Sequence, residues 1–212
     1  MNSKTERSII QGPAGAIECL KDLASAEIPF KGWAFVAHPH PLFGGTMDNK
    51  VVQTLARSFS QNGWNVVRFN FRGVGQSEGV HDNGVGEVQD LLFLINYFAA
   101  SGPIAMAGFS FGAFVTSSAI SQIYTTRESD IKSIVLVGTA ASRFTVPMIA
   151  QSMHDKVLVL HGEIDDTVPL QNVLDWARPQ SLAVTVIPGV EHFFHGQLPL
   201  LKNLISRHLR LV

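Results

Sequence analysis

A serine between two glycines is the first feature of the sequence that could do chemistry. Ser110 lies at the centre of Gly-Phe-Ser-Phe-Gly, residues 108–112. In a Gly-x-Ser-x-Gly motif the serine stands on a strained turn between a strand and a helix, where the crowded backbone leaves no space for a Cβ atom at the glycines. The apolar run Pro103–Ala107 precedes the motif, and the small-residue helical pattern Phe111–Ile123 follows it. Ser110 is therefore predicted to be a nucleophile.

A histidine and several acids follow this serine at the ends of later apolar runs. A serine hydroxyl is a poor nucleophile at neutral pH, so a base must take its proton and a carboxylate must orient that base. Val157–Leu160 runs into an acidic loop, and Val184–Ile187 runs into a loop that contains His192. The order serine, acid, histidine is typical of enzymes with this kind of nucleophile motif. The order predicts a Ser-His-acid triad.

Four sequence segments resemble those of a known family. His-Gly-x-x-Asp-x-x-Val-Pro (161–169) and Gly-x-x-His-Phe-Phe (189–194) are similar to the acid and histidine motifs of the α/β-hydrolase superfamily. Residues 38–50 and 70–79 resemble segments of small lidless bacterial serine esterases, which are relatives of the dienelactone hydrolases. The resemblance covers nearly the whole chain and implies an α/β-hydrolase fold without a cap domain.

The resemblance also implies which acid and which histidine serve the triad. Asp165 matches the acid position of the motif, Asp166 is one residue off it, and Glu163 is a third alternative. His192 matches the histidine position, whereas His195 is expected in the first turn of the closing helix, where a surface histidine is ordinary. Asp165 and His192 are therefore the predicted partners of the nucleophile.

Acyl transfer also needs two backbone N–H groups that stabilise the charge developing on the carbonyl oxygen. One is predicted to belong to Phe111, the residue after the nucleophile. The other is expected from the loop 38–45, whose two prolines have no N–H, so that His40, Leu42 and Phe43 remain. The dienelactone-hydrolase pattern, in which an aliphatic residue precedes Phe-Gly, implies Leu42.

Other aromatic and histidine side chains have simpler interpretations. Phe43 and Phe193 flank the predicted catalytic positions and are expected to line an acyl pocket. His38 and His40 have a spacing that could suit a metal ion, but no carboxylate or cysteine accompanies them at metal-site spacing. A histidine that braces the loop is the favoured interpretation, and His81 is interpreted as solvated.

A glycine-rich segment could be mistaken for a cofactor site. In Gly73–Glu78 the third glycine of a dinucleotide fingerprint is replaced by Glu78, although that glycine is needed for close helix–strand packing. Neither an organic cofactor nor a metal is expected.

The elements that must position these residues alternate along the chain. Apolar runs of strand type occur at Trp33–Ala37, Val66–Phe71, Ile104–Gly108, Ile134–Val137, Val157–Leu160 and Val184–Ile187. Helical patterns between them predict an α/β fold, a mostly parallel sheet with helices on both faces. One or two antiparallel strands are expected within Gln11–Pro29. The interval between Val137 and Val157 is too short for a multi-helix cap.

Composition limits the class of protein and its partners. Lys and Arg together number 16 and Asp and Glu 17, so no basic field for nucleic acid is expected. The one cysteine, Cys19, cannot form an intramolecular disulfide, and no long apolar segment predicts a leader or a membrane span. Residues 1–212 are thus expected to form a single α/β-hydrolase domain in the cytoplasm. The oligomeric state stays open.

Together these features predict a serine hydrolase, specifically a carboxylesterase that cleaves small or varied acyl esters through an acyl-enzyme. A small-molecule ester is the expected partner. A thioesterase, a peptidase or an acyltransferase would use the same three side chains and stays open. An inactive binding or scaffold protein would be expected to have lost one of them.

Overall fold

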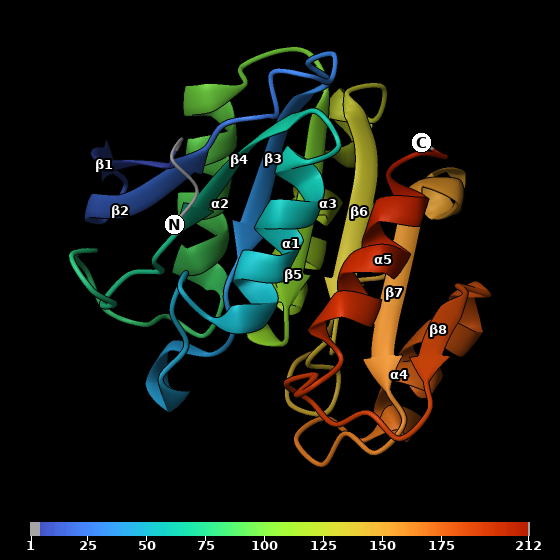
Figure 1. The fold of residues 1–212 in the computed structure, drawn as a ribbon. Helices are drawn as coiled ribbons and strands as arrows, with labels where there is room; N and C mark the ends of the chain where they lie inside the picture. Colours follow the sequence, from blue (N-terminus) through green and yellow to red (C-terminus); the bar gives the residue numbers. More distant parts are fainter. Residues whose placement is uncertain (1–4, 212) are drawn as a thin grey trace.

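An eight-stranded sheet forms the centre of the computed structural model, which describes residues 5–211 (Figure 1). The strands are β1 (Thr5–Gly12), β2 (Gly15–Asp22), β3 (Gly32–Ala37), β4 (Trp64–Phe69), β5 (Ile104–Phe109), β6 (Ile131–Val137), β7 (Val157–Gly162) and β8 (Val184–Ile187). Their order across the sheet is β1-β2-β4-β3-β5-β6-β7-β8. The hairpin β1–β2 is antiparallel, β2 is antiparallel to β4, and the other neighbouring strands are parallel.

Helices cover both faces of this sheet. They are α1 (Lys50–Ser60), α2 (Val85–Phe98), α3 (Phe111–Arg127), α4 (Leu170–Ala177) and α5 (Leu198–His208), with short 3-10 helices at Pro41–Phe43, Gln151–Lys156 and Arg178–Gln180. On one face α1 and α5 pack together, and on the other face α2 packs against α3 (Figure 1). Within residues 5–211, none of the helices has the length and apolar character needed to cross a membrane.

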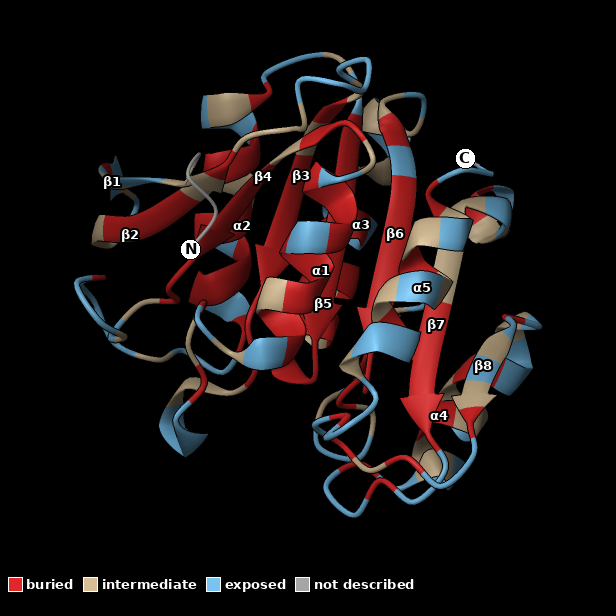
Figure 2. Cartoon of the chain, viewed as in Figure 1, coloured by how far each residue is buried: buried red, intermediate tan, exposed pale blue. Residues whose placement is uncertain are grey.

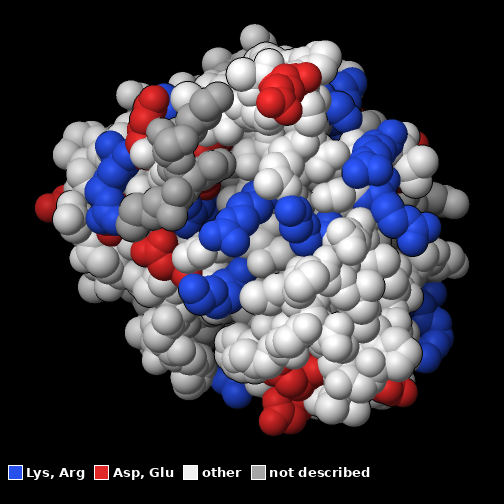
Figure 3. Space-filling model, viewed as in Figure 1, with Lys and Arg blue, Asp and Glu red and all other residues white. Residues whose placement is uncertain are grey.

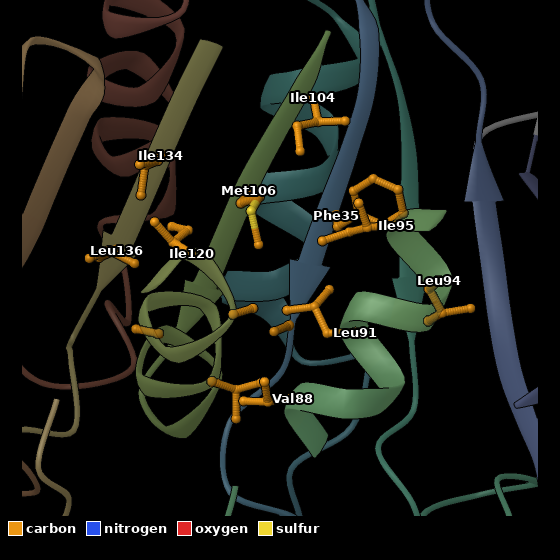
Figure 4. Packing of buried hydrophobic residues seen from close by; sticks show 14 of the residues in the cluster. Phe35, Val88, Leu91, Leu94, Ile95, Ile104, Met106, Ile120, Ile134 and Leu136 are labelled. Atoms are coloured by element: carbon orange, nitrogen blue, oxygen red, sulfur yellow. The ribbon is translucent and has the colours of Figure 1, made fainter. Parts of the chain in front are cut away.

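Alternate residues of the strands supply the two hydrophobic cores. Successive side chains of a strand point to opposite faces, so Phe35 and Met106 join the core under α2 and α3, while Val36 and Ala107 join the core under α1 and α5. Figure 4 shows side chains of the first core. All six residues of β5 are buried (Figure 2). Burial on both faces explains why β5 is apolar throughout.

The strands lie close to their predicted positions. The predicted run Val184–Ile187 coincides with β8, and the early antiparallel strands are present as a hairpin that begins at Thr5, ahead of the predicted segment. The predicted boundaries differ most at two strands: β4 is Trp64–Phe69 rather than Val66–Phe71, and β6 begins at Ile131 rather than Ile134. The residue after β4, Asn70, still donates from its backbone N–H to the carbonyl oxygen of Glu18 in β2 at 2.9 Å, and its side-chain oxygen accepts from the backbone N–H of Met47 at 2.9 Å.

The parallel strands all end at one edge of the sheet, the lower edge in Figure 1. The loops after β3, β5, β7 and β8 meet at this edge, where α/β proteins carry their ligand sites. Residues 138–156, all of them described, connect β6 to β7 with a single short 3-10 helix and no α-helix. The edge therefore has no cap at this connection.

Candidate active site

The turn between β5 and α3 presents Ser110 at this edge. Ser110 has φ 57° and ψ −116°, a conformation that L-residues rarely adopt. A Cβ atom at Gly108 would lie 2.2 Å from the carbonyl oxygen of Gly112, and one at Gly112 would lie 2.3 Å from that of Ala37. Backbone crowding thus explains both glycines, and the predicted strand-turn-helix geometry is present.

The loops after β7 and β8 bring an acid and a histidine to Ser110. The Nε2 atom of His192 lies 3.0 Å from Ser110 Oγ, and its Nδ1 atom lies 2.6 Å from Asp165 Oδ2. All three residues are buried. A carboxylate oxygen can only accept, so Nδ1 carries the proton and Nε2 is free to accept from the serine hydroxyl. This arrangement can deprotonate Ser110 as it attacks an electrophile.

The Asp165 carboxylate is oriented by its own loop. Its Oδ1 atom accepts from the backbone N–H groups of Thr167 (3.0 Å) and Val168 (2.7 Å), which leaves Oδ2 for the histidine. His161, buried beneath it, donates from Nε2 to the carbonyl oxygen of Val168 at 2.9 Å. Burial lowers the pKa of His161, which keeps this ring neutral.

The alternative acids and the alternative histidine lie elsewhere. Asp166 is exposed, and its carboxylate accepts from the hydroxyl of the next residue. Glu163 accepts from the backbone N–H of Gly189 at 2.8 Å. His195 is 83% exposed beside Glu191 and lies in a turn before α5, so the prediction that it opens this helix is wrong. None of these three side chains contacts Ser110.

The geometry distinguishes the backbone donors that could face an oxyanion. Within residues 5–211, the N–H of Phe111, at the first position of α3, has no acceptor. In the loop after β3, the N–H of Leu42 donates to His40 Nδ1 at 3.3 Å, and that of Phe43 donates to the carbonyl oxygen of His40 at 3.1 Å. These bonds argue against the assignment of Leu42. The N–H of His40 has no acceptor in the described chain, and it replaces Leu42 as the candidate.

A cavity of about 300 Å³ opens beside Ser110. It is lined by Pro39, His40, Phe43, Gly44, Gly45, Asn49, Ser110, Phe111, Ala140, Arg143, Phe144, Thr167, Val168, His192 and Phe193. Phe43 and Phe193, which were predicted to lie at an acyl pocket, both line this cavity. Phe144 and Arg143 also line it, and sequence reasoning missed both because the segment after β6 carries no motif.

His38 holds the loop after β3 in place. Its Nδ1 atom donates to the carbonyl oxygen of Pro39 at 2.6 Å, and its Nε2 atom accepts from the backbone N–H of Phe71 at 2.9 Å. Burial lowers the pKa of His38 to about 3, and the bond from Phe71 requires the neutral ring, because Nε2 must be free to accept. Among the described residues, no group of three or more His, Cys, Asp or Glu side chains could hold a metal ion.

His81 is not solvated, contrary to the prediction. Only 9% of its side chain is exposed, and its Nδ1 atom lies 3.0 Å from the fully buried carboxylate of Glu87. Its ring lies 4.8 Å from that of His40 and 5.4 Å from that of Phe111, centroid to centroid. The loop before α2 thus folds over the aromatic residues beside the cavity, a long-range contact that the local sequence does not indicate.

Known proteins share this fold and its lack of a cap. The family model described as serine aminopeptidase, S33, matches residues 42–154, just over half of the chain. The crystal structure of XC6422 from Xanthomonas campestris, described as an α/β serine hydrolase without a lid, is similar with a TM-score of 0.85 and 30% identity, over 99% of this chain and 95% of that chain.

Two further proteins are similar along most of their length. An α/β serine hydrolase homologue from Coxiella burnetii has a TM-score of 0.80 and 36% identity, over 96% of this chain and 97% of that chain. The uncharacterised protein RP471 of Rickettsia prowazekii is 31% identical, over 93% of this chain and 86% of that protein. The fold and these similarities define a lidless α/β serine hydrolase, and the predicted fold class is confirmed. Within the α/β-hydrolase superfamily, the chain belongs to the family described as serine aminopeptidase, S33.

Proposed function

We propose that this protein is a carboxylesterase that cleaves small acyl esters through a Ser110 acyl-enzyme. The observation that carries the proposal is the unbroken line of hydrogen bonds from Asp165 through His192 to Ser110, which ends at the wall of a mostly apolar cavity. The family model includes Ser110 but ends before the other two residues, so their roles rest on this geometry.

Acylation begins with attack on the ester carbonyl carbon. Ser110 Oγ forms the new C–O bond while His192 Nε2 takes its proton, and the Asp165 carboxylate stabilises the resulting imidazolium. The carbonyl oxygen becomes an oxyanion, for which the N–H groups of Phe111 and His40 are the proposed donors. His192 then gives its proton to the leaving alcohol as the tetrahedral intermediate collapses to the acyl-enzyme.

Deacylation repeats these steps with water as the nucleophile. His192 takes a proton from the water as its oxygen attacks the acyl carbon, and then returns a proton to Ser110 Oγ as the acid leaves. The open edge of the sheet gives water direct access to the acyl-enzyme, because no cap covers the connection between β6 and β7. Access of water favours hydrolysis over transfer of the acyl group to another acceptor.

A peptidase is the second candidate, because the matching family is described as serine aminopeptidase. An aminopeptidase must bind the positively charged amino terminus of its substrate, which a carboxylate does best. Among the described residues, no Asp or Glu lines the cavity beside Ser110, and Arg143 is the one Lys or Arg that does. The charge of the lining therefore favours an ester over an amino-terminal peptide.

The test compares one acyl group on three leaving groups. We expect the para-nitrophenyl butyrate ester to be turned over with a higher kcat/KM than the matched butyryl thioester and butyryl anilide. Ser110→Ala should lower ester turnover by on the order of 10⁶-fold. Ser121→Ala, which removes an exposed hydroxyl of α3, is the matched control and should keep wild-type activity.

Labelling of the serine separates the remaining alternatives. A fluorophosphonate probe should label the wild-type protein and Ser121→Ala but not Ser110→Ala, because only an activated serine reacts. An unlabelled wild-type protein would instead indicate an inactive scaffold. A labelled protein that cleaves an amino-acid anilide faster than the butyrate ester would overturn the esterase proposal in favour of the peptidase.

A further inference from the structure

Arg143 stands at the wall of the cavity beside Ser110, and we propose that it binds a carboxylate of the substrate. On this inference, which rests on the proposed ester hydrolysis, the substrate is an ester that carries a negative charge next to an apolar body. Arg143 is then a specificity-determining residue.

The segment that carries Arg143 is a tight turn after β6. The backbone N–H groups of Arg143 and Phe144 both donate to the carbonyl oxygen of Ala140, at 3.2 and 3.1 Å. The Phe144 ring stacks on Phe114 of α3, with centroids 4.6 Å apart and an interplanar angle of 14°. The turn is thus attached to the helix that begins at the nucleophile, and the base of the Arg143 side chain is well positioned.

The guanidinium group of Arg143, an exposed residue of the cavity lining, lies over the Phe43 ring rather than beside an acid of the protein. Its central carbon lies 5.2 Å from the centroid of the Phe43 ring, within the range of a cation–π contact. Arg68 and Arg72, in contrast, form ion pairs with Asp22 and Asp90. In the part of the chain that the structure describes, Arg143 has no carboxylate partner, so its N–H donors are available to a ligand.

The acids nearest to the cavity are engaged or lie outside its wall. Asp165 is bound to His192. Glu191 accepts from the backbone N–H groups of Phe193 and His195 and pairs with the His195 ring. Figure 3 shows acidic groups at the lower rim of the molecule, the edge where the strands end in Figure 1. Within residues 5–211, the cavity wall itself contains no Asp or Glu that could compete for Arg143.

The charge of Arg143 acts inside the site. The pKa of His40 is lowered by burial first, and then by the neighbouring charges of His81 and Arg143. His40 also lines the cavity. A cation that influences a ring of this wall is close enough to attract an anionic group of a bound ester.

The surroundings of Arg143 indicate the rest of the substrate. Phe43, Phe144, Phe111 and Phe193 line the same cavity and offer ring faces to an aliphatic chain or an aromatic ring. A guanidinium group binds a carboxylate through two parallel N–H···O bonds. The favoured substrate class is therefore an ester of an apolar acid or alcohol that ends in a free carboxylate.

The experiment uses two pairs of esters that differ only in charge. In the acyl-side pair, the mono-para-nitrophenyl ester of pimelic acid is compared with an ester of equal length in which an isopropyl end replaces the carboxylate. In the alcohol-side pair, para-butyryloxybenzoate is compared with para-butyryloxybenzamide. For the wild-type protein, kcat/KM should be higher for the anionic member of at least one pair, and that pair identifies which side of the ester contacts Arg143.

Variants then assign the preference to one side chain. Arg143→Met keeps an unbranched stem over Phe43 but removes the charge, and it should lower the anionic-to-neutral ratio of kcat/KM by on the order of 10- to 100-fold. Arg207→Met, which removes an exposed arginine of α5, is the matched control and should leave the ratio unchanged. Arg143→Glu should favour the neutral ester over the anionic one.

The outcomes separate this inference from the proposed function. If the wild-type protein cleaves neutral esters but shows no preference in either pair, or if Arg143→Met keeps the preference, the role of Arg143 is refuted and the esterase proposal stands. If the wild-type protein cleaves none of the four esters, the proposed function fails and the inference fails with it.

Discussion

His38 is a residue whose protonation state is determined by its position in the fold. The neutral ring donates to Pro39 and accepts from Phe71, and burial lowers its pKa from 6.5 to about 3. As the pH falls below 6.5, the unfolded chain binds a proton at this histidine while the folded protein does not. The stability that neutral His38 contributes is therefore complete above pH 6.5 and is lost as the pH falls toward 3.

This linkage predicts a loss of stability in mild acid. Between pH 6.5 and pH 5 the His38 contribution should fall by about 2 kcal/mol, since one proton corresponds to about 1.4 kcal/mol per pH unit. Urea unfolding at several pH values measures the change. His38→Gln should show a flatter pH dependence, whereas His195→Gln, at an exposed position, should behave as the wild type. An unchanged slope in His38→Gln would contradict this account.

Asp165 and Asp166 offer a matched pair for the proposed acid. Asp165→Asn keeps the oxygen that accepts from Thr167 and Val168 but presents an amide to His192, which no longer selects the Nδ1–H tautomer. We expect kcat to fall by about 10⁴-fold for the butyrate ester. Asp166→Asn, one residue along the chain and exposed, should keep wild-type kcat. Equal losses in the two variants would argue against the assignment.

The proposed roles of residues that belong to a motif could be predicted from the sequence. Roles that depend on a contact made only in the folded structure could not. Ser110, Asp165 and His192 each follow an apolar run at a recognisable spacing, and the structure brings their side chains together. Leu42 was chosen by its place in a pattern. The bond from its N–H to the His40 ring depends on the local 3-10 turn, which a pattern does not specify.

At the scale of elements, close packing of α3 against β3 determines the position of Ser110, the proposed nucleophile, relative to the sheet. Gly112→Ala would place a methyl group 2.3 Å from the carbonyl oxygen of Ala37, so α3 must move away. We expect a loss of about 1–3 kcal/mol of stability together with a lower kcat per folded molecule. At Gly102 an added Cβ atom would have no other atom within 4 Å. Gly102→Ala should therefore change the free energy of unfolding but leave kcat unchanged.

The bounds of a strand could be predicted well where both faces of the strand are buried. β5 matches its apolar run closely, because residues covered on both faces must be apolar along their whole length. β8 is an edge strand with Thr185 exposed, and its apolar run coincides with the strand although its burial is incomplete. The boundary of β4 was less accurate, since Phe71 is buried outside the sheet beside His38 and Phe111. A residue buried in a loop resembles one buried in a strand, and only the hydrogen-bond ladder distinguishes them.

At the scale of the whole molecule, the short connection between β6 and β7 leaves the edge of the sheet that carries Ser110 without a cap at this connection. A lidded lipase becomes active when an oil–water interface opens its lid, and this chain has no such element at that connection. We expect the rate on a medium-chain ester to saturate smoothly as its concentration passes the solubility limit. A steep increase in rate at that limit, measured beside a lidded lipase as reference, would contradict this prediction.

The unusual conformation of Ser110 also has an evolutionary consequence. A side chain at φ 57° and ψ −116° costs on the order of 1–3 kcal/mol, and glycine is the residue that relieves this cost. Ser110→Gly should therefore raise the thermal unfolding temperature while it abolishes turnover. For a descendant no longer selected for its chemistry, loss of the hydroxyl would be an advantage for stability. The strain at Ser110 is thus a cost to stability that the proposed role of its hydroxyl as the nucleophile accounts for.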